Sequence, residues 1–597
     1  MKTRKFLLGL LACLSVFAGS LGVAACGGND SSSSASNSSN SSNAESSVGG
    51  GQGASDSSGE SSSESSGGGS EEGGLNEWDI EKISEGLEFT LLENDTYEVS
   101  GVGDCADTQL VIPNVYNEKA VTAIGENAFY NCANLTGVLI PESITTIGEN
   151  AFNGCYKLVE IVNKSANLTI SKGASSNGYV GFFALAIYNS GDTFTGTKVS
   201  NDNGYIVYTD EAQKIAIGYT GADVNLILPS YITGINKYAF AYCENLTSIT
   251  IGESVASIGY SALVACEGLT EIKVDEDNAT YKDIDGNLYT KDGKTLVGYA
   301  IGKTATSFTV PSGVTSIGRE AFLGCRSLES IEISDGVTSI GKLAFSNCIA
   351  LTNVTIPDSI NSIGTYAFFG CNGLQYNEYE NAKYLASKTN DYFILMEIKD
   401  KEASEYTIHN TAKIIAPNVF SECVSLTSIV IPDSVIFIGD NAFDNCDSLT
   451  DITCPAFALS YVKKGILKTV VITSGDSLAK NLFKSSKNLK SVVIGDSVKS
   501  IGDYAFYACA KLESVTIGSG VKSIGTKAFR GCYILESITI PSSVTSMAAE
   551  AFFNCPKLNT ITFNGTVEQW NAIEKGENWN KKTPAAKVIC SDGEASV

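Results

Sequence analysis

Apolar residues recur along most of the chain with a period of about 23 residues, which is in the range of repeat proteins. In residues 246–251, apolar and polar positions alternate, which is typical of a half-buried strand. Residues 254–259 predict a second short extended segment after a turn. Residues 262–266, Ala-Leu-Val-Ala-Cys, predict a single helical turn, and Leu269 restarts the cycle. One unit cannot bury its own inward side chains, so we expect the units to stack as coils that share a core.

A cysteine marks the same point in most units. Cysteines that lie one period apart, called the period cysteines below, are Cys132 and Cys155; Cys243 and Cys266; Cys325, Cys348 and Cys371; Cys423 and Cys446; Cys509, Cys532 and Cys555. Ser486 takes this position once and has nearly the same volume, which indicates a packing position. The chain has no Cys-x-x-Cys spacing of the kind that holds zinc. We expect buried free thiols, although a separation of one coil also permits disulfides. Cys105, Cys454 and Cys590 lie outside the period, and their pairing stays open.

Four longer segments interrupt the period, near residues 163–220, 274–310, 374–415 and 451–480. Turn dipeptides lie between apolar runs in the first two, at Asn203-Gly204, Asp285-Gly286 and Asp292-Gly293. We therefore expect hairpins or widened coils that project from one side of the stack. Such inserts can form a binding face, or they can only adjust the curvature of the stack.

The first 25 residues predict an address signal. A basic start precedes an apolar run from Phe6 to Phe17 that is too short for an ordinary membrane span. Residues 21–26, Leu-Gly-Val-Ala-Ala-Cys, resemble a bacterial lipobox, and this resemblance implies cleavage after Ala25 and lipidation of Cys26. The alternative is an ordinary secretory signal with an incidental cysteine. Residues 27–74 are almost entirely Ser, Gly, Asn, Asp and Glu, a composition that cannot bury a core and predicts a disordered tether.

Composition argues against several kinds of chemistry. The formal net charge of −25 disfavours binding to a phosphate backbone. His409 is the one histidine of the chain, and the sequence places no nucleophile or carboxylate preferentially beside it. We expect no enzyme activity, no catalytic residue, no metal site and no cofactor.

The repeated phrase resembles the BspA-type family of bacterial leucine-rich repeats, also called the Treponema pallidum type. The resemblance rests on units such as residues 328–348, which run from Leu-Glu-Ser-Ile-Glu-Ile to Ala-Phe-Ser-Asn-Cys, and it extends over most of residues 85–597. It implies a repeat solenoid of the α/β leucine-rich repeat type, with mostly short strands and short helical turns. Residues 99–113 resemble the lead-in of this family, and the segment from Phe563 through Trp570 and Trp579 resembles its C-terminal end.

These features predict a division of the chain into five parts. They are a lipoprotein signal peptide, residues 1–25; the lipidated cysteine and tether, 26–74; an entry cap, 75–121; the solenoid with its four inserts, 122–563; and a C-terminal cap, 564–597. We interpret Trp570 and Trp579 as cap residues rather than ligand platforms.

The family resemblance implies a non-enzymatic surface lipoprotein that adheres to proteins of host or bacterial surfaces. Many weak contacts along the solenoid, multiplied over many copies on one membrane, would provide the strength. The alternative is a glycan-capture lipoprotein of a polysaccharide-uptake system. We expect an extracytoplasmic, lipid-anchored monomer with no nucleic-acid partner. The outward aromatic residues are interpreted first as half-buried packing residues and second as contact residues: Tyr130, Tyr242, Phe369, Tyr507 and Phe553. The sequence leaves the ligand-binding residues unknown.

Overall fold

The computed structural model describes residues 78–211 and 213–597. They fall into two compact units. The first unit contains the described residues up to Val224, Leu228–Asn245 and Ser254–Val264; the second contains Asn225–Ile227, Leu246–Glu253 and Ala265–Val597. The signal peptide, Ala25, Cys26 and the tether lie outside the described residues.

Stacked coils joined by parallel strands build both units, so the predicted repeat solenoid is confirmed. A regular coil contributes one longer strand and one two-residue strand. For example, β39 (Ser514–Ile517) and β40 (Ser523–Ile524) come from the same coil and pair with different parallel sheets. Buried and exposed side chains alternate along β39, as the apolar pattern predicts.

The first unit holds three sheets. The first has the order β1 (Glu88–Leu91), β2 (Tyr97–Gly101), β5 (Lys119–Ile124) and β4 (Val115–Tyr116), with β7 (Thr146–Ile147) also paired to β5. The second has the order β3 (Gln109–Val111), β6 (Gly137–Ile140), β8 (Glu160–Asn163) and β9 (Ala186–Tyr188). The third has the order β10 (Val199–Asp202), β11 (Tyr205–Asp210), β12 (Gln213–Tyr219), β14 (Gly234–Ile235) and β16 (Ser257–Ile258).

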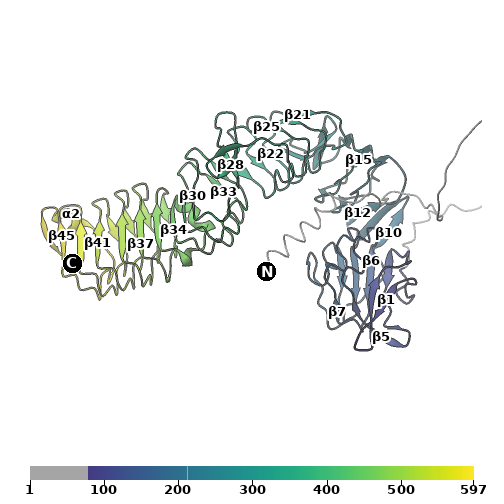
Figure 1. Ribbon diagram of the computed structural model, residues 1–597, viewed down its shortest axis with the longest axis horizontal. Helices are drawn as coiled ribbons and strands as arrows, with labels where there is room; N and C mark the ends of the chain where they lie inside the picture. The colour runs from purple at the N-terminus through teal and green to yellow at the C-terminus, as the bar shows by residue number, and fades with distance from the viewer. Residues whose placement is uncertain (1–77, 212) are drawn as a thin grey trace, which may run out of the picture. The chain divides into compact units, whose positions relative to one another are not determined.

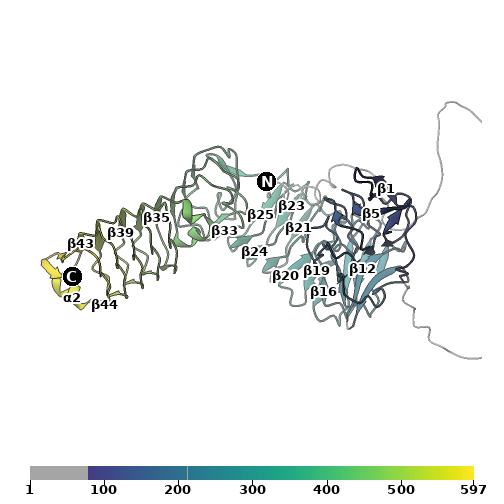
Figure 2. The same ribbon diagram turned by 90° about the horizontal axis from the view of Figure 1, so that it is seen from below.

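The second unit holds the remaining sheets (Figures 1 and 2). Two three-stranded sheets have the orders β13 (Asn225–Ile227), β15 (Ser248–Ile251), β17 (Glu271–Val274), and β21 (Ser307–Thr309), β23 (Ser330–Glu332), β25 (Asn353–Thr355). A six-stranded sheet has the order β18 (Tyr281–Ile284), β19 (Asn287–Thr290), β20 (Thr295–Gly298), β22 (Ser316–Ile317), β24 (Ser339–Ile340), β26 (Ser362–Ile363). A five-stranded sheet has the order β27 (Asn377–Tyr379), β28 (Ala382–Leu385), β29 (Ile394–Ile398), β31 (Ile414–Ile415), β33 (Phe437–Ile438).

The C-terminal coils contain the longest sheet. Its ten strands are β30 (Glu405–Thr407), β32 (Ser428–Val430), β34 (Asp451–Cys454), β35 (Thr469–Ile472), β37 (Ser491–Ile494), β39, β41 (Ser537–Ile540), β43 (Thr560–Phe563), β45 (Lys587–Cys590) and β46 (Gly593–Ser596). The accompanying sheet of short strands has the order β36 (Ser477–Leu478), β38 (Ser500–Ile501), β40, β42 (Ser546–Met547), β44 (Glu574–Lys575).

Three of the four predicted inserts form the same motif. Each is a three-stranded antiparallel meander, namely β10–β12, β18–β20 and β27–β29. The predicted hairpin turns are confirmed, because Asn203-Gly204, Asp285-Gly286 and Asp292-Gly293 connect these strands. The third strand of each meander pairs in parallel with the next coil, so each meander begins a new parallel sheet. The fourth insert differs and forms two 3-10 helices, η1 (Ala456–Tyr461) and η2 (Lys464–Ile466).

The predicted helical turn at residues 262–266 is wrong. The segment is a run of turns, because Ser261 and Ala265 adopt the left-handed conformation, with φ of 56° and 57°. The equivalent segment of a regular coil shows what replaces the helical hydrogen bonds. There, the amides of Phe322 and Phe345 donate to carbonyl oxygens of the following coil, at 2.8 Å each. The backbone groups are thus satisfied between coils rather than within a helix.

The core contains stacked phenylalanines and the period cysteines. Phe345 lies between Phe322 and Phe368, with ring centroids 4.9 and 5.0 Å apart. The period cysteines are buried except Cys132, which is half-buried, and all described cysteines are free thiols. The prediction of a buried cysteine row is therefore confirmed.

A short helix and two tryptophans follow β43. Helix α2 (Val567–Ala572) begins with a capping box, in which Thr566 accepts from the Gln569 amide. Trp570 and Trp579 are 1% and 7% exposed, and their rings lie 5.8 Å apart. Both indoles belong to the apolar core of the second unit.

Candidate ligand-binding pocket at a break in the repeat

The third insert interrupts the solenoid at β26. This strand is the last of its sheet, and the next sheet begins with the meander β27–β29. The phenylalanine stack also ends here, since Phe368 closes one row and the next row consists of Phe420 and Phe443, 5.1 Å apart. A regular coil would cover Phe368 with the next phenylalanine. The insert puts other residues there and leaves a space.

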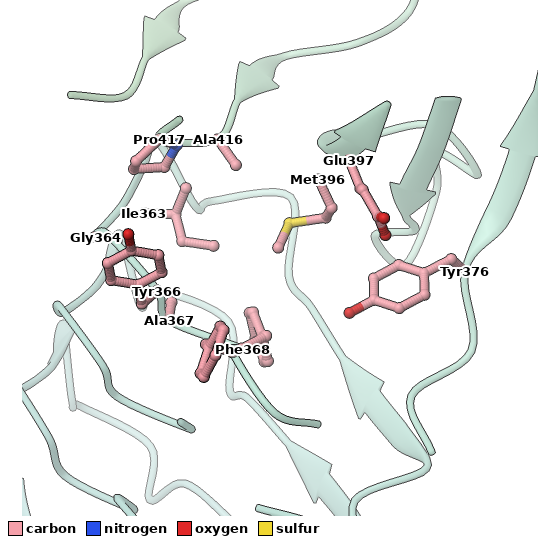
Figure 3. A pocket seen from close by; sticks show the side chains of 11 residues that line it. Ile363, Gly364, Tyr366, Ala367, Phe368, Tyr376, Met396, Glu397, Ala416 and Pro417 are labelled. Carbon is pink, nitrogen blue, oxygen red and sulfur yellow. The ribbon is translucent and has the colours of Figure 1, made fainter. Parts of the chain in front are cut away.

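That space is a pocket of about 260 Å³ (Figure 3). Its lining comes from the end of one row of coils and from the meander that begins the next: Ile363, Gly364, Tyr366, Ala367, Phe368, Phe369, Tyr376, Met396, Glu397, Ala416 and Pro417. Figure 3 shows the Met396 side chain between Ile363 and Tyr376. A volume of this size suits one large side chain or one sugar ring, and it is below the usual range for a whole small-molecule ligand.

The wall of the pocket is apolar and aromatic. Ile363 and Phe368 are core residues, whereas Met396 is half-buried and packs against the same core. Phe369 is 42% exposed at the mouth, far more than the 5% of Phe368 beside it. An apolar group that entered the pocket would therefore exchange water for aromatic and thioether surfaces.

One charged and two phenolic groups lie on the polar side of the pocket. The Glu397 carboxylate contacts Lys383 at 2.8 Å and remains 58% exposed. Burial raises the pKa of Tyr376 to about 12, with smaller contributions from Cys371 and Glu397. Burial also raises the pKa of Tyr366, so both phenols are neutral donors at physiological pH. The site offers hydrogen bonds and one carboxylate, but no nucleophile paired with a base.

His409 lies in an aromatic cluster. Its ring stacks on Tyr392 at 4.0 Å and meets Tyr379 edge-on at 4.8 Å, while Nδ1 lies 2.9 Å from the Thr411 hydroxyl. These contacts give the histidine a packing role. Among residues 78–211 and 213–597, no group of three His, Cys, Asp or Glu side chains is arranged to hold a metal ion.

The predicted outward aromatic residues are partly exposed. Tyr130 and Phe369 are 37% and 42% exposed, and Tyr242, Tyr507 and Phe553 are half-buried. Of these, Phe369 lines the pocket. Sequence analysis placed an insert at this point but did not identify Met396 or Glu397. The available signal was the interruption of the period between Cys371 and Cys423.

Coils with one long and one short parallel strand, a buried cysteine and a stacked phenylalanine define a solenoid of the leucine-rich repeat class. The family described as BspA type leucine rich repeat region matches the chain in 6 copies, at residues 99–180, 220–291, 301–400, 397–474 and 476–574. Because these stretches cover well over half of the chain, it belongs to this family. Proteins built on this repeat are typically binding scaffolds.

Several solved structures match the chain. A leucine rich cell surface protein from Faecalibacterium prausnitzii is 25% identical, with a TM-score of 0.23, and the match covers 83% of this chain and 97% of that one. A leucine-rich repeat protein from Bacteroides ovatus is 19% identical, with a TM-score of 0.21 and coverage of 85% and 99%. The leucine rich repeat protein of T. pallidum is 22% identical, with a TM-score of 0.17 and coverage of 44% and 89%. Because these TM-scores are low, the family assignment rests on the repeat match.

No curated protein matches the chain. In the part of the chain that the structure describes, no helix is both long and apolar enough to pass through a bilayer.

Proposed function

We propose that this protein is a non-enzymatic bacterial surface protein that adheres to proteins of host or bacterial surfaces. The observation that carries the proposal is the pocket at the third insert. A partner would place one apolar or aromatic side chain against Phe368, Phe369 and Met396. Small pockets with aromatic walls are typical positions for the few residues that dominate a protein interface.

The polar side of the pocket favours a particular kind of anchor. Glu397 is mostly exposed, so its carboxylate can accept hydrogen bonds from a partner as well as from Lys383. A lysine, an arginine or a tyrosine of the partner would pair its donors with this carboxylate and its apolar part with the aromatic wall.

A pair of matched variants tests the pocket. Phe369→Ala removes an exposed ring from the pocket, and Phe457→Ala removes a similarly exposed ring, 40% against 42%, from η1 in another insert. The wild-type protein and both variants are applied to an array of host matrix proteins and bacterial surface proteins. We expect a bound protein to lose affinity by about tenfold with Phe369→Ala and to keep it with Phe457→Ala. Equal binding by all three proteins would exclude the pocket as the contact site.

We further propose that a lipid holds the protein at the membrane. Cleavage after Ala25 and lipidation of Cys26 would leave residues 26–74 as the tether of the folded body, which residues 564–597 would close as a cap. Cys26→Ala should release the protein into the medium, whereas Cys13→Ala, inside the proposed signal peptide, should leave it with the membrane fraction. Membrane retention of Cys26→Ala would contradict lipid anchoring.

Glycan capture is the second candidate, and an aromatic cluster in the first unit supports it. Tyr156 stacks on Tyr238 at 4.6 Å, and Tyr242 and Tyr260 lie against these two rings. All four are half-buried, so parts of their rings face solvent. Binding to neutral oligosaccharides that survives high salt would favour this candidate over protein adhesion.

A further inference from the structure

The C-terminal coils differ in charge from the rest of the chain. Residues 480–597 contain 14 Lys and Arg against 10 Asp and Glu, a formal net charge of +4, although the whole chain carries −25. A local excess of positive charge on an acidic protein indicates a surface for a negatively charged partner.

Cations and aromatic rings alternate in register on these coils. Positions 484, 507, 530 and 553 follow one another at intervals of one period and hold Lys, Tyr, Arg and Phe in that order. A second row holds Tyr504 and Lys527, which are also one period apart. We call these six residues the cation–aromatic ladder: Lys484, Tyr504, Tyr507, Lys527, Arg530 and Phe553.

The side chains of the ladder contact one another across coils. The Lys484 ammonium lies 5.6 Å from the centre of the Tyr504 ring and 5.8 Å from that of Tyr507. Lys527 lies 5.5 Å from the same Tyr504 ring. Each of these rings thus lies within cation–π distance of at least one lysine.

The same pattern continues into the next coils. The Arg530 guanidinium lies 5.9 Å from the Tyr507 ring centre and 4.6 Å from that of Phe553. Lys582 is 5.4 Å from Phe553 and extends the ladder by one cation. Lys484 and Lys582 are exposed, and the Lys527 and Arg530 side chains keep 27% and 32% of their surface accessible. A ligand can therefore reach both the charges and the ring edges.

The spacing of the ladder selects among anionic partners. Core rings on these coils, Phe506, Phe529 and Phe552, stack at 5.0 and 5.1 Å, so one coil has about the length of one sugar unit. Cations recur in the first row every second coil, roughly 10 Å apart at strand spacing. In an extended acidic peptide, side chains on one face are roughly 7 Å apart, which does not match the spacing of the cations. An acidic polysaccharide with one charged group in every second sugar does fit.

Glu550 occupies part of the ladder. Its carboxylate pairs with Arg530, and it lies 3.9 Å from the Lys527 ammonium. The glutamate holds the place that a ligand carboxylate or sulfate would take. A polysaccharide must compete with this internal carboxylate for the same cations.

We propose that the cation–aromatic ladder binds an acidic polysaccharide, with its carboxylate or sulfate groups on Lys484, Lys527 and Arg530 and its sugar rings on the aromatic side chains. This site is separate from the pocket at the third insert and does not depend on the protein adhesion proposed above.

The test measures binding of the intact protein to immobilised hyaluronan and heparin, with neutral dextran, poly-glutamate and phosphatidylglycerol vesicles as comparison probes. Lys484→Ser/Arg530→Ser removes two ladder cations. Lys499→Ser/Lys522→Ser removes two exposed lysines from adjacent coils outside the ladder and is the matched control. We expect the ladder variant to bind the acidic polysaccharides about tenfold more weakly and the control to change about twofold at most.

Three further variants make the result specific. Glu550→Gln should bind more tightly, because the competing carboxylate is gone. Tyr507→Ser should weaken binding, whereas Tyr533→Ser, at a tyrosine 46% exposed outside the ladder, should not. Phe369→Ala should leave polysaccharide binding unchanged. Circular dichroism of each variant shows that its fold is intact.

Several results would overturn the proposal. They are absence of binding to both acidic polysaccharides, equal binding by the ladder and control variants, or equal binding to dextran. Poly-glutamate or vesicles bound as tightly, with the same loss in the ladder variant, would assign the surface to an acidic peptide or a membrane instead.

Discussion

The period cysteines do more at the residue scale than fill space. The Cys348 thiol donates a hydrogen bond to the Phe322 carbonyl oxygen, 26 residues earlier, at 3.1 Å, and Cys532 does the same to Phe506 at 3.4 Å. Each thiol thus links two coils, and its bond adds to the one that the same carbonyl already accepts from the amide of Cys325 or Cys509. Ser486 has no such phenylalanine carbonyl in the preceding insert, and its hydroxyl has no partner among the described residues. Sequence analysis recognised the packing position but not this hydrogen bond, because the bond depends on the register between coils.

Burial of these thiols makes stability dependent on pH. Burial raises the pKa of Cys423 to about 11, and it raises the pKa values of Cys446 and Cys509 to about 12, from an ordinary value of 9.0. The folded state therefore keeps these protons while the unfolded chain loses them. The stabilisation is complete below pH 9 and is lost progressively as the pH rises toward 12. At pH 9.5 we expect a loss of about 1 kcal/mol per thiol in the free energy of unfolding.

Guanidinium unfolding at pH 7 and pH 9.5 measures this effect. The variant Cys446→Ser/Cys509→Ser should show a smaller decrease of the midpoint than the wild-type protein. An equal decrease in both proteins would assign the pH dependence to other groups.

At the scale of elements, the sequence predicts the regular coils better than the connections between them. Asn203-Gly204 predicts its hairpin because the dipeptide itself favours the turn. Ser261 and Ala265, by contrast, are not typical left-handed residues, and the carbonyls of Ala262 and Val264 between them accept hydrogen bonds from the preceding coil. The pocket was predictable only as an insert, since Met396 and Glu397 reach Phe368 through tertiary pairing of β29. The ladder residues lie one period apart, so the sequence predicts their alignment on successive coils. The contacts between their cations and rings could not be predicted, because they depend on side-chain conformation.

The third meander should stabilise the coils that follow it against local unfolding. Tyr384 in β28 is 0% exposed and contacts the His409 amide through its hydroxyl, at 3.1 Å. Tyr384→Asp would bury a carboxylate without a cation beside it, which costs several kcal/mol. We expect faster hydrogen exchange in β27–β33 and unchanged exchange in β38–β42. Asn372→Asp, which adds a carboxylate at an exposed position just before the insert, is the control. Uniformly faster exchange along the chain would show that the meander is not a local unit.

At the scale of the whole molecule, each coil should be stabilised mainly by its contacts with the two adjacent coils, as in other repeat proteins. The Trp570 ring lies 5.4 Å from that of Phe563 in β43, and its indole nitrogen donates to the Ser596 carbonyl at 3.2 Å. We expect Trp570→Ala to cost about 3–5 kcal/mol locally and to expose β41–β46 to hydrogen exchange. Strands β20–β26, many coils away, should be unchanged. An effect of equal size on both groups of strands would contradict nearest-neighbour stabilisation.

In the proposed function, the partner binds where the regular repeat is altered, and the regular coils support these positions. Met396, Phe369, Tyr366 and Tyr376 line the pocket, and thioethers and aromatic rings report solvent access by oxidation. Hydroxyl-radical footprinting of the full chain, alone and with the array protein that binds it most tightly, therefore tests the pocket directly. The account predicts protection of these four side chains and unchanged oxidation of Tyr533 and Phe457. Protection confined to other surfaces, with the pocket residues oxidised as in the free protein, would contradict it.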